Sequence, residues 1–182
     1  EPSRDGLSET STSGDRLSTT PQHLVDLFSD LFGVMVVVTD IDGHPLTDVV
    51  NPCGFFSALL DVPHITDLCT SEWASLGTHP ALTPTWLESR FGFKCARAFL
   101  RSDNQLVGMV IAGGVRSATI PDPESLDKLA KELGVEVDRL EQHHADMYDL
   151  DEVRQDEVAR GLATLATHLS DLRTNSEQRS EQ

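Results

Sequence analysis

The chain has 182 residues and a formal net charge of −16, with 14 basic residues against 30 acidic ones. This acidity argues against nucleic acid and anionic membranes as direct partners, because both are bound mainly through clustered Lys and Arg. No apolar run approaches the roughly 20 residues of a membrane-spanning helix. Three cysteines, an odd number, favour the reducing cytoplasm over a disulfide framework.

The composition divides the chain into four segments. Residues 1–20 carry nine Ser or Thr and no aromatic residue, so we expect a disordered leader or linker there. Apolar periodicity then predicts one folded domain over 21–148 and a C-terminal helix over 149–173, which either signals or packs on the domain. The polar residues 174–182 are expected to be a disordered tail.

The domain is expected to open with an amphipathic helix that Gly33 ends. Its apolar face is formed by Leu24, Leu27, Phe28, Leu31 and Phe32.

The next segment, Val34–Val38, is a short apolar run rich in β-branched residues, which is typical of a strand buried on both faces. Asp42-Gly43 follows as a strong hairpin signal, because Gly accepts a positive φ and Asp tolerates it. We therefore predict an antiparallel hairpin whose second strand lies between Leu46 and Val50.

The same segment allows an alternative, because Asp40 and Asp42 after a buried strand are also typical of a haloacid-dehalogenase-like phosphatase. That enzyme would need a Thr near position 44 to hold phosphate, but His44-Pro45 stands there. It would also need paired acids after a later apolar strand to hold magnesium, and no such strand is visible. A motif without its structural context is weak, so we favour a protein that is not an enzyme.

The second half of the sequence predicts another strand pair and three helices. Gly108, Gly113 and Gly114 lie inside the last strand, where glycine often marks the close approach of a ligand or a neighbouring backbone. The expected strands are Phe91–Leu100 and Leu106–Val115, after short helices between Cys53 and Thr85. The expected helices are Glu124–Leu133, Glu136–His144 and Glu152–Arg173.

Several strings in this order resemble the PocR-type sensory domain, a PAS-like ligand-binding domain, over residues 21–173. They are Val36–Leu46, Asn51-Pro52-Cys53, Leu68–Glu72, Leu106–Val115 and Leu126–Val135. The resemblance implies an α+β fold, with a PAS-like antiparallel sheet covered by short helices, an N-terminal helix and a C-terminal helical segment. It also implies a small-molecule sensor that relays its ligand state to a partner or an output module through helix packing.

In such a domain the irregular middle section covers the sheet and encloses the ligand, which we expect to be a small apolar or amphipathic molecule. The residues expected to line this pocket are Cys53, Phe55, Phe56, Cys69, Trp73, Phe93, Cys95 and Gly113. A structural or interaction subunit with a degenerate pocket remains a third possibility.

The cofactor is unknown from the sequence. Cys53, Cys69 and Cys95, with His64, are candidates for a tetrahedral zinc site, and the thiolates could instead hold an iron–sulfur cluster. The cysteines are widely spaced and lack a Cys-x-x-Cys pair, however, and free Cys commonly packs as a small hydrophobe.

The long C-terminal helix carries an apolar seam that spans only two heptads, fewer than a coiled coil needs. The seam is expected to pack on its own domain or to bind a protein partner or a second copy of the chain. Its residues are Val158, Leu162, Leu165, Leu169 and Leu172.

Overall fold

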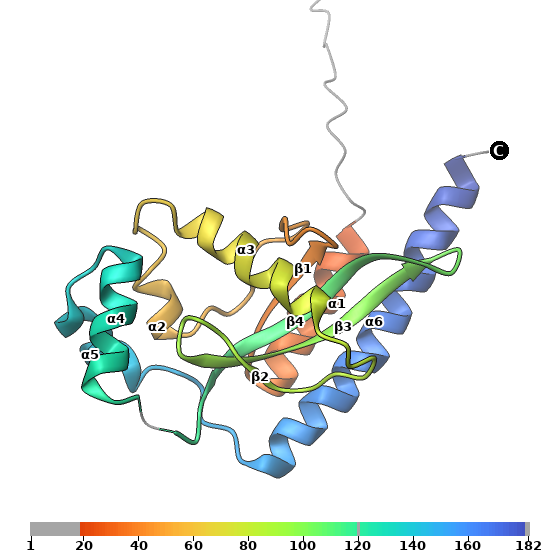
Figure 1. The fold of residues 1–182 in the computed structure, drawn as a ribbon. Coiled ribbons are helices and arrows are strands. Elements are labelled where there is room, and N and C mark those ends of the chain that lie inside the picture. The colour runs from red at the N-terminus through yellow and green to blue at the C-terminus, as the bar shows by residue number, and fades with distance from the viewer. Residues whose placement is uncertain (1–18, 120, 181–182) are drawn as a thin grey trace, which may run out of the picture.

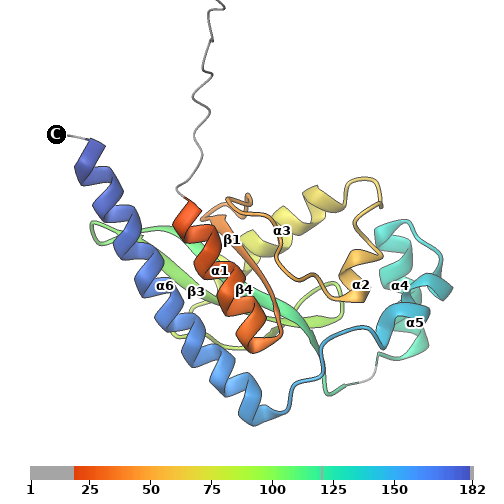
Figure 2. The same ribbon diagram turned by 180° about the vertical axis from the view of Figure 1, so that it is seen from behind.

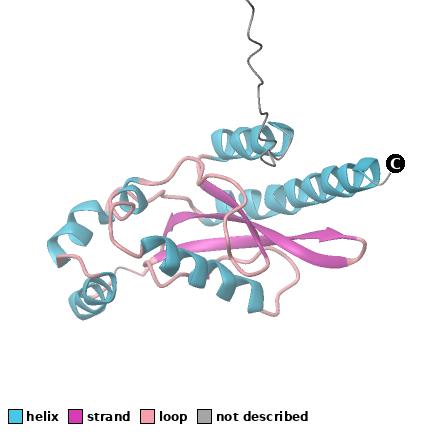
Figure 3. Cartoon of the chain, turned by 90° about the horizontal axis from the view of Figure 1, so that it is seen from above, coloured by secondary structure: helices cyan, strands magenta, loops and turns pink. Residues whose placement is uncertain are grey.

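The computed structural model describes residues 19–119 and 121–180, so that most of the expected leader lies outside the described residues. At its centre is a four-stranded antiparallel sheet with the strand order β1-β4-β3-β2. Helices cover both faces of this sheet (Figures 1 and 3). The expected α+β, PAS-like architecture is confirmed.

The two inner strands form one long hairpin, because β3 (Phe93–Ser102) turns directly into β4 (Gln105–Arg116). The turn uses Asp103 and Asn104, both with positive φ, as two-residue hairpin turns require. β2 (Leu87–Glu88) adds only two residues to the outer edge of β3. The sequence analysis predicted the long hairpin but missed this short edge strand.

β1 (Met35–Asp40) pairs with β4, and the chain then turns back along the free side of β1. The Asp40 carboxylate holds the turn by accepting the backbone N–H groups of Asp42 and His44 at 2.9 and 2.8 Å. The returning segment makes only isolated bridges, at Pro45 and Val50, and is not the regular second strand that was expected. Pro45 has no N–H group to donate to a ladder, which favours isolated bridges over a continuous strand.

One face of the sheet is covered by α1 (Thr19–Phe32) and α6 (Glu152–Ser180), which lie side by side in front of the strands in the view of Figure 2. The core on this face joins Val34, Val36 and Val38 to alanines and valines of β3 and β4. We call this core the α6-side core. The helix α6 runs on to Ser180, so the structure corrects the tail that was expected from residue 174.

The apolar seam of α6 lies inside the α6-side core and not on a free surface. Val158 and Leu162 are fully buried, Leu165 and Leu169 are buried, and Leu172 is half-buried. Of the two alternatives, the structure shows packing on the chain's own sheet. The seam is therefore not an exposed surface for a partner or a second copy.

The opposite face of the sheet is covered by four shorter helices: α2 (Gly54–Ser57), α3 (Ile65–Thr78), α4 (Pro123–Leu133) and α5 (Val137–His144). The α4 helix has clear start and stop signals, because the Asp122 carboxylate caps its first turn and Gly134 ends it in the left-handed conformation. No described helix is long and apolar enough to cross a membrane.

The turn after β1 packs tightly against α3 through Gly43, which has a φ of +86°. A Cβ placed there would overlap the carbonyl oxygen of Thr70 and lie 2.7 Å from the backbone nitrogen of Ala74. Gly33 offers a matched control, because it also has a positive φ (+66°) but would place a Cβ in open space.

We expect Gly43→Ala to lower the free energy of unfolding well beyond Gly33→Ala. The control bears only the left-handed penalty of about 1–2 kcal/mol, whereas Gly43→Ala adds an overpacking cost of about 1–3 kcal/mol. Urea unfolding of the two variants measures the difference. Equal losses would show that the turn does not pack on α3.

Candidate functional site

The residues predicted to line a pocket do come together, in the core between the sheet and α2 to α5. Cys53 precedes α2, which carries Phe55 and Phe56, while α3 carries Cys69 and Trp73. Phe93 and Cys95 come from β3, and all seven side chains belong to one buried cluster. Gly113 of β4 lies beneath Cys95 and Phe93. We call this cluster the α3-side core.

Two of the three sulfurs lie against adjacent residues of β4. A Cβ built on Gly113 would be 2.9 Å from the Cys95 Sγ, and one built on Gly114 would be 3.2 Å from the Cys53 Sγ. The absence of side chains at these glycines thus makes room for the cysteines. Cys69 approaches from α3 into the same core.

The three thiols of this core are all buried. Burial, with a smaller contribution from the Glu72 charge, raises the pKa of Cys69 to about 12. Burial likewise raises the pKa of Cys95 and of Cys53 above the ordinary thiol value. Since the thiolate is the nucleophile and the metal ligand, these protonated thiols behave as small apolar side chains.

The fourth candidate metal ligand, His64, lies outside the α3-side core. It is exposed just before α3, where its imidazole is 3.8 Å from the Asp67 carboxylate. Within residues 19–119 and 121–180, no group of three or more His, Cys, Asp or Glu side chains is arranged to hold a metal ion.

Four phenylalanines fill the part of the α3-side core next to β3. The rings of Phe91 and Phe93 stack at 5.8 Å between centroids, with 21° between their planes. Phe55 and Phe56 each meet Phe93 edge to face at 6.3 Å. Such ring pairs stabilise a fold beyond the contribution of their apolar burial. We call these four phenylalanines the aromatic wall.

A recess of about 130 Å³ opens beside this wall, between the turn before β3 and the helices α4 and α5. Its apolar lining comes from Phe55, Phe91, Leu126, Leu129 and Met147.

Polar groups of the recess lie mainly at Ser89, Arg90, Ser125 and His144. Burial, and then the Arg116 charge, lower the pKa of His144 below its ordinary value, so the ring is neutral at pH 7. Arg90 lies 3.2 Å from Glu132 and 3.8 Å from Glu72, and these carboxylates offset its charge. The recess therefore presents hydrogen-bonding groups with little net charge.

The sequence analysis missed the contribution of α4 and α5, because it confined the pocket cover to the irregular middle section of the chain. Trp86, at the end of that section, packs on the other face of the sheet, where its indole N–H donates to the Gln155 carbonyl of α6 at 2.9 Å. The available signal was the helical spacing of Leu126, Leu129 and Leu133. That spacing shows that α4 buries one face, but it does not show which element this face packs against.

The fold is that of a PAS-like domain, in which helices and a sheet enclose a small recess. The sequence matches the family described as the sensory domain found in PocR over residues 19–174. The chain therefore belongs to the PocR sensory-domain family. No curated protein matches it, and neither does any solved structure.

The contact of Gly113 with Cys95 predicts a specific coupling. Gly113→Ala should destabilise the fold by about 1–3 kcal/mol, because the new methyl group overpacks against the sulfur. In a Cys95→Ala background most of this loss should disappear. A double-mutant cycle from denaturant unfolding measures the coupling, and additive losses would place the sulfur away from the glycine.

The raised pKa values predict the reactivity of the cysteines. At pH 8 the native protein should react very slowly with a thiol reagent such as dithionitrobenzoate, whereas the unfolded protein should titrate three thiols. Rapid reaction of one thiol in the native state would show that its cysteine is open to solvent.

Proposed function

We propose that the chain is a non-enzymatic sensor that binds one small, uncharged and mostly apolar molecule in the recess beside Phe55 and Phe91. The observation that carries this proposal is the recess itself, which opens between the aromatic wall and the α4–α5 pair of a PocR sensory domain. Of the eight residues predicted to line a pocket, Phe55 would contact the ligand in this recess. The other seven would support the aromatic wall.

The dimensions and polarity of the recess limit the ligand. An apolar cavity of about 150 Å³ holds benzene, so a recess of about 130 Å³ suits a molecule of similar size. The neutral His144 ring provides one donor or acceptor, and the Ser89 hydroxyl, which donates to the Phe93 carbonyl at 2.6 Å, can still accept a hydrogen bond. A short alcohol, diol, ketone or amide fits these groups.

The connection that follows the recess provides a route to α6. His144 and Met147 line the recess, and the next residue, Tyr148, is fixed to the end of β4. Its N–H donates to the Gly114 carbonyl at 2.8 Å, and its carbonyl accepts the Arg116 N–H at 2.7 Å. Because α6 begins a few residues later, a ligand that shifts Met147 would shift the start of α6, which a protein partner or an output module could read.

The position of Asp40 supports a sensor over the phosphatase alternative. Asp40 ends an edge strand of an antiparallel sheet, and its carboxylate is occupied by the turn that follows. Burial tends to raise the pKa of Asp40, but hydrogen bonds from His44 and Asp42 outweigh it and leave the pKa lowered. This carboxylate is a capping group and is poorly placed to attack a phosphate.

A thermal-shift screen of uncharged molecules with up to about eight non-hydrogen atoms, a range set by the volume of the recess, tests the proposal. Binders should stabilise the parent and the control Lys128→Leu, which alters an exposed residue of α4. They should fail to stabilise Ser125→Leu, which fills the recess from the same helix. Ligand-dependent hydrogen exchange over residues 144–156 would report the relay.

Two results would contradict the proposal. Finding no binder at millimolar concentration would favour the structural subunit with a degenerate pocket. Magnesium-dependent release of phosphate from an aryl phosphate, lost in Asp40→Asn, would favour the phosphatase.

A further inference from the structure

The outer edge of β3 is largely left without a partner strand. β2 covers this edge only at Lys94 and Cys95, although β3 is ten residues long. If β2 continued in the same register, Pro84 would stand opposite Ala98, and a proline cannot donate to a ladder. No described strand therefore pairs with residues 96–102 on this side.

The register shows which backbone groups of β3 point out of the sheet. From the β2 side, the Ser89 N–H donates to the Phe93 carbonyl at 2.9 Å, and the direction of these groups alternates along a strand. Both irregularities of the β3–β4 ladder place their extra residue in β4, so the alternation along β3 is unbroken. The N–H and C=O groups of Arg97 and Phe99 therefore point outward.

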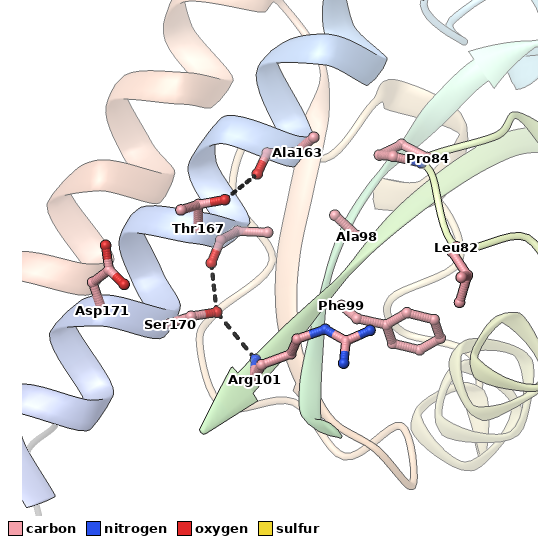
Figure 4. Close-up of a pocket in the computed structure, with 10 residues that line it drawn as sticks. Leu82, Pro84, Ala98, Phe99, Arg101, Ala163, Thr167, Ser170 and Asp171 are labelled. Carbon is pink, nitrogen blue, oxygen red and sulfur yellow. Dashed lines mark hydrogen bonds between the residues drawn. The ribbon is translucent and has the colours of Figure 1, made fainter. Parts of the chain in front are cut away.

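These outward groups have no partner in the described part of the chain. The next N–H in the series, that of Arg101, donates to the Ser170 hydroxyl of α6 at 3.0 Å (Figure 4), whereas no such bond is made by the backbone of Arg97 or Phe99. The loop before β2 does not supply one, because two of its carbonyls accept from the Arg97 side chain at 2.7 and 2.6 Å. An edge of this kind is a template for a further strand.

A pocket of about 260 Å³ runs beside these groups, between β3, α6 and the loop that precedes β2. Figure 4 shows Ala98 and Phe99 of β3 between that loop and α6. The wall on α6 carries the small side chains of Ala163 and Ala166, which leave space beside the strand. We call this space the open pocket. Because α6 and the loop border it on two sides, a single extended segment fits there better than the broad edge of a second sheet.

The segment that precedes α1 can reach the open pocket. α1 begins at Thr19 and contacts α6, but it lines no part of this pocket. Figure 2 shows the start of α1 beside the C-terminal half of α6, and residues 163–171 of that half form the pocket wall. The chain thus has to cross one helix, which is about 10–12 Å wide with its side chains. Residues 14–18 span about 16–18 Å when extended, which is enough.

Residues 7–13, which lie outside the described residues, have a composition that suits this edge. They form a run without Gly or Pro, bounded by Gly6 and Gly14. Five of the seven are Ser or Thr, whose small side chains fit a pocket walled by alanines, and threonine favours strands. Leu7 supplies one larger apolar side chain.

We propose that residues 7–13 add a fifth strand to the sheet, in the open pocket along the outer edge of β3. This strand exchanges backbone hydrogen bonds with Arg97 and Phe99. It covers an edge that would otherwise be free to pair with another chain, and it ties the N-terminal segment to α6. The inference is independent of the proposed sensor site, because the open pocket shares no lining residue with the recess.

Amide hydrogen exchange of the whole chain, resolved by NMR, tests this proposal. The Arg97 and Phe99 N–H groups should exchange at least about tenfold faster in the double variant Ser11→Pro with Thr12→Pro than in the parent, as the loss of a strand's hydrogen bonds predicts. Two adjacent prolines are used because one of two successive N–H groups must face β3 in either register. The N–H of Ala98, which faces β4, should stay slow in both proteins.

The control is the double variant Ser3→Pro with Arg4→Pro, which places two prolines before Gly6 and should leave exchange unchanged. Equally fast exchange of Arg97 and Phe99 in the parent and in the first variant would overturn the proposal and leave the edge to a strand of another protein. Protection that rises with protein concentration would overturn it in favour of a second copy. Loss of protection in the control as well would show that residues 7–13 are not the strand.

Discussion

The rest of the structure depends on the burial of the sheet on both faces. Side chains alternate along a strand, so successive residues of β1 enter different cores: Met35 and Val37 enter the α3-side core, and Val36 and Val38 enter the α6-side core. β4 divides in the same way, with Ile111 on one side and its neighbours on the other. Both cores are built on the same strands, so the two layers of helices depend on each other.

Segments far apart in the sequence must therefore meet on the sheet. The α6-side core joins the first described helix to the last one, and the α3-side core joins α2 and α3 to the helices that follow β4. Tyr148 is the residue that contacts both cores, and its hydroxyl donates to the Asn51 carbonyl at 2.6 Å. It closes the connection between α5 and α6 against the segment that follows β1.

The sequence predicted those parts of the fold that local periodicity determines. The apolar run at Val34–Val38, the long hairpin and the α4 helix were all predicted from the sequence, because an apolar run, turn-forming residues such as Asp103 and Asn104, and a helix cap are local features. The segment after Gly43 was less predictable, since its bridges depend on how the turn packs against α3.

The partners of each apolar face could not be predicted from the same signals. The α6 seam shows that one helical face is buried, but the same spacing serves a dimer and a domain core equally well. The polar end of α6 likewise looked like a tail. In the structure this end is held by single polar contacts, such as that of the Ser102 hydroxyl with the Glu177 carboxylate at 2.7 Å, which no hydropathy pattern reveals.

The candidate site was likewise predictable only in part. The clustering of Cys53, Phe55, Cys69 and Cys95 was predicted through the family resemblance, which carries long-range information that spacing lacks. Metal binding was a guess from residue type alone. Ligation depends on which atoms converge and whether thiols ionise, and burial has raised the thiol pKa values here. The contribution of α4 and α5 to the recess could not be predicted from local patterns, because it depends on the tertiary arrangement of these helices.

The packing of α6 limits how this helix can respond to events at either pocket. At Gly161 a Cβ would lie 2.8 to 3.0 Å from the rings of Phe32 and Phe28, so α1 crosses α6 in close contact there. Toward its C-terminal end, α6 instead borders the open pocket at Ala163, Ala166 and Ser170. Leu165 and Leu169 are nevertheless buried beyond this point, so the sheet holds α6 on both sides of Gly161. The proposed relay through Met147 would therefore have to move α6 against both α1 and the sheet.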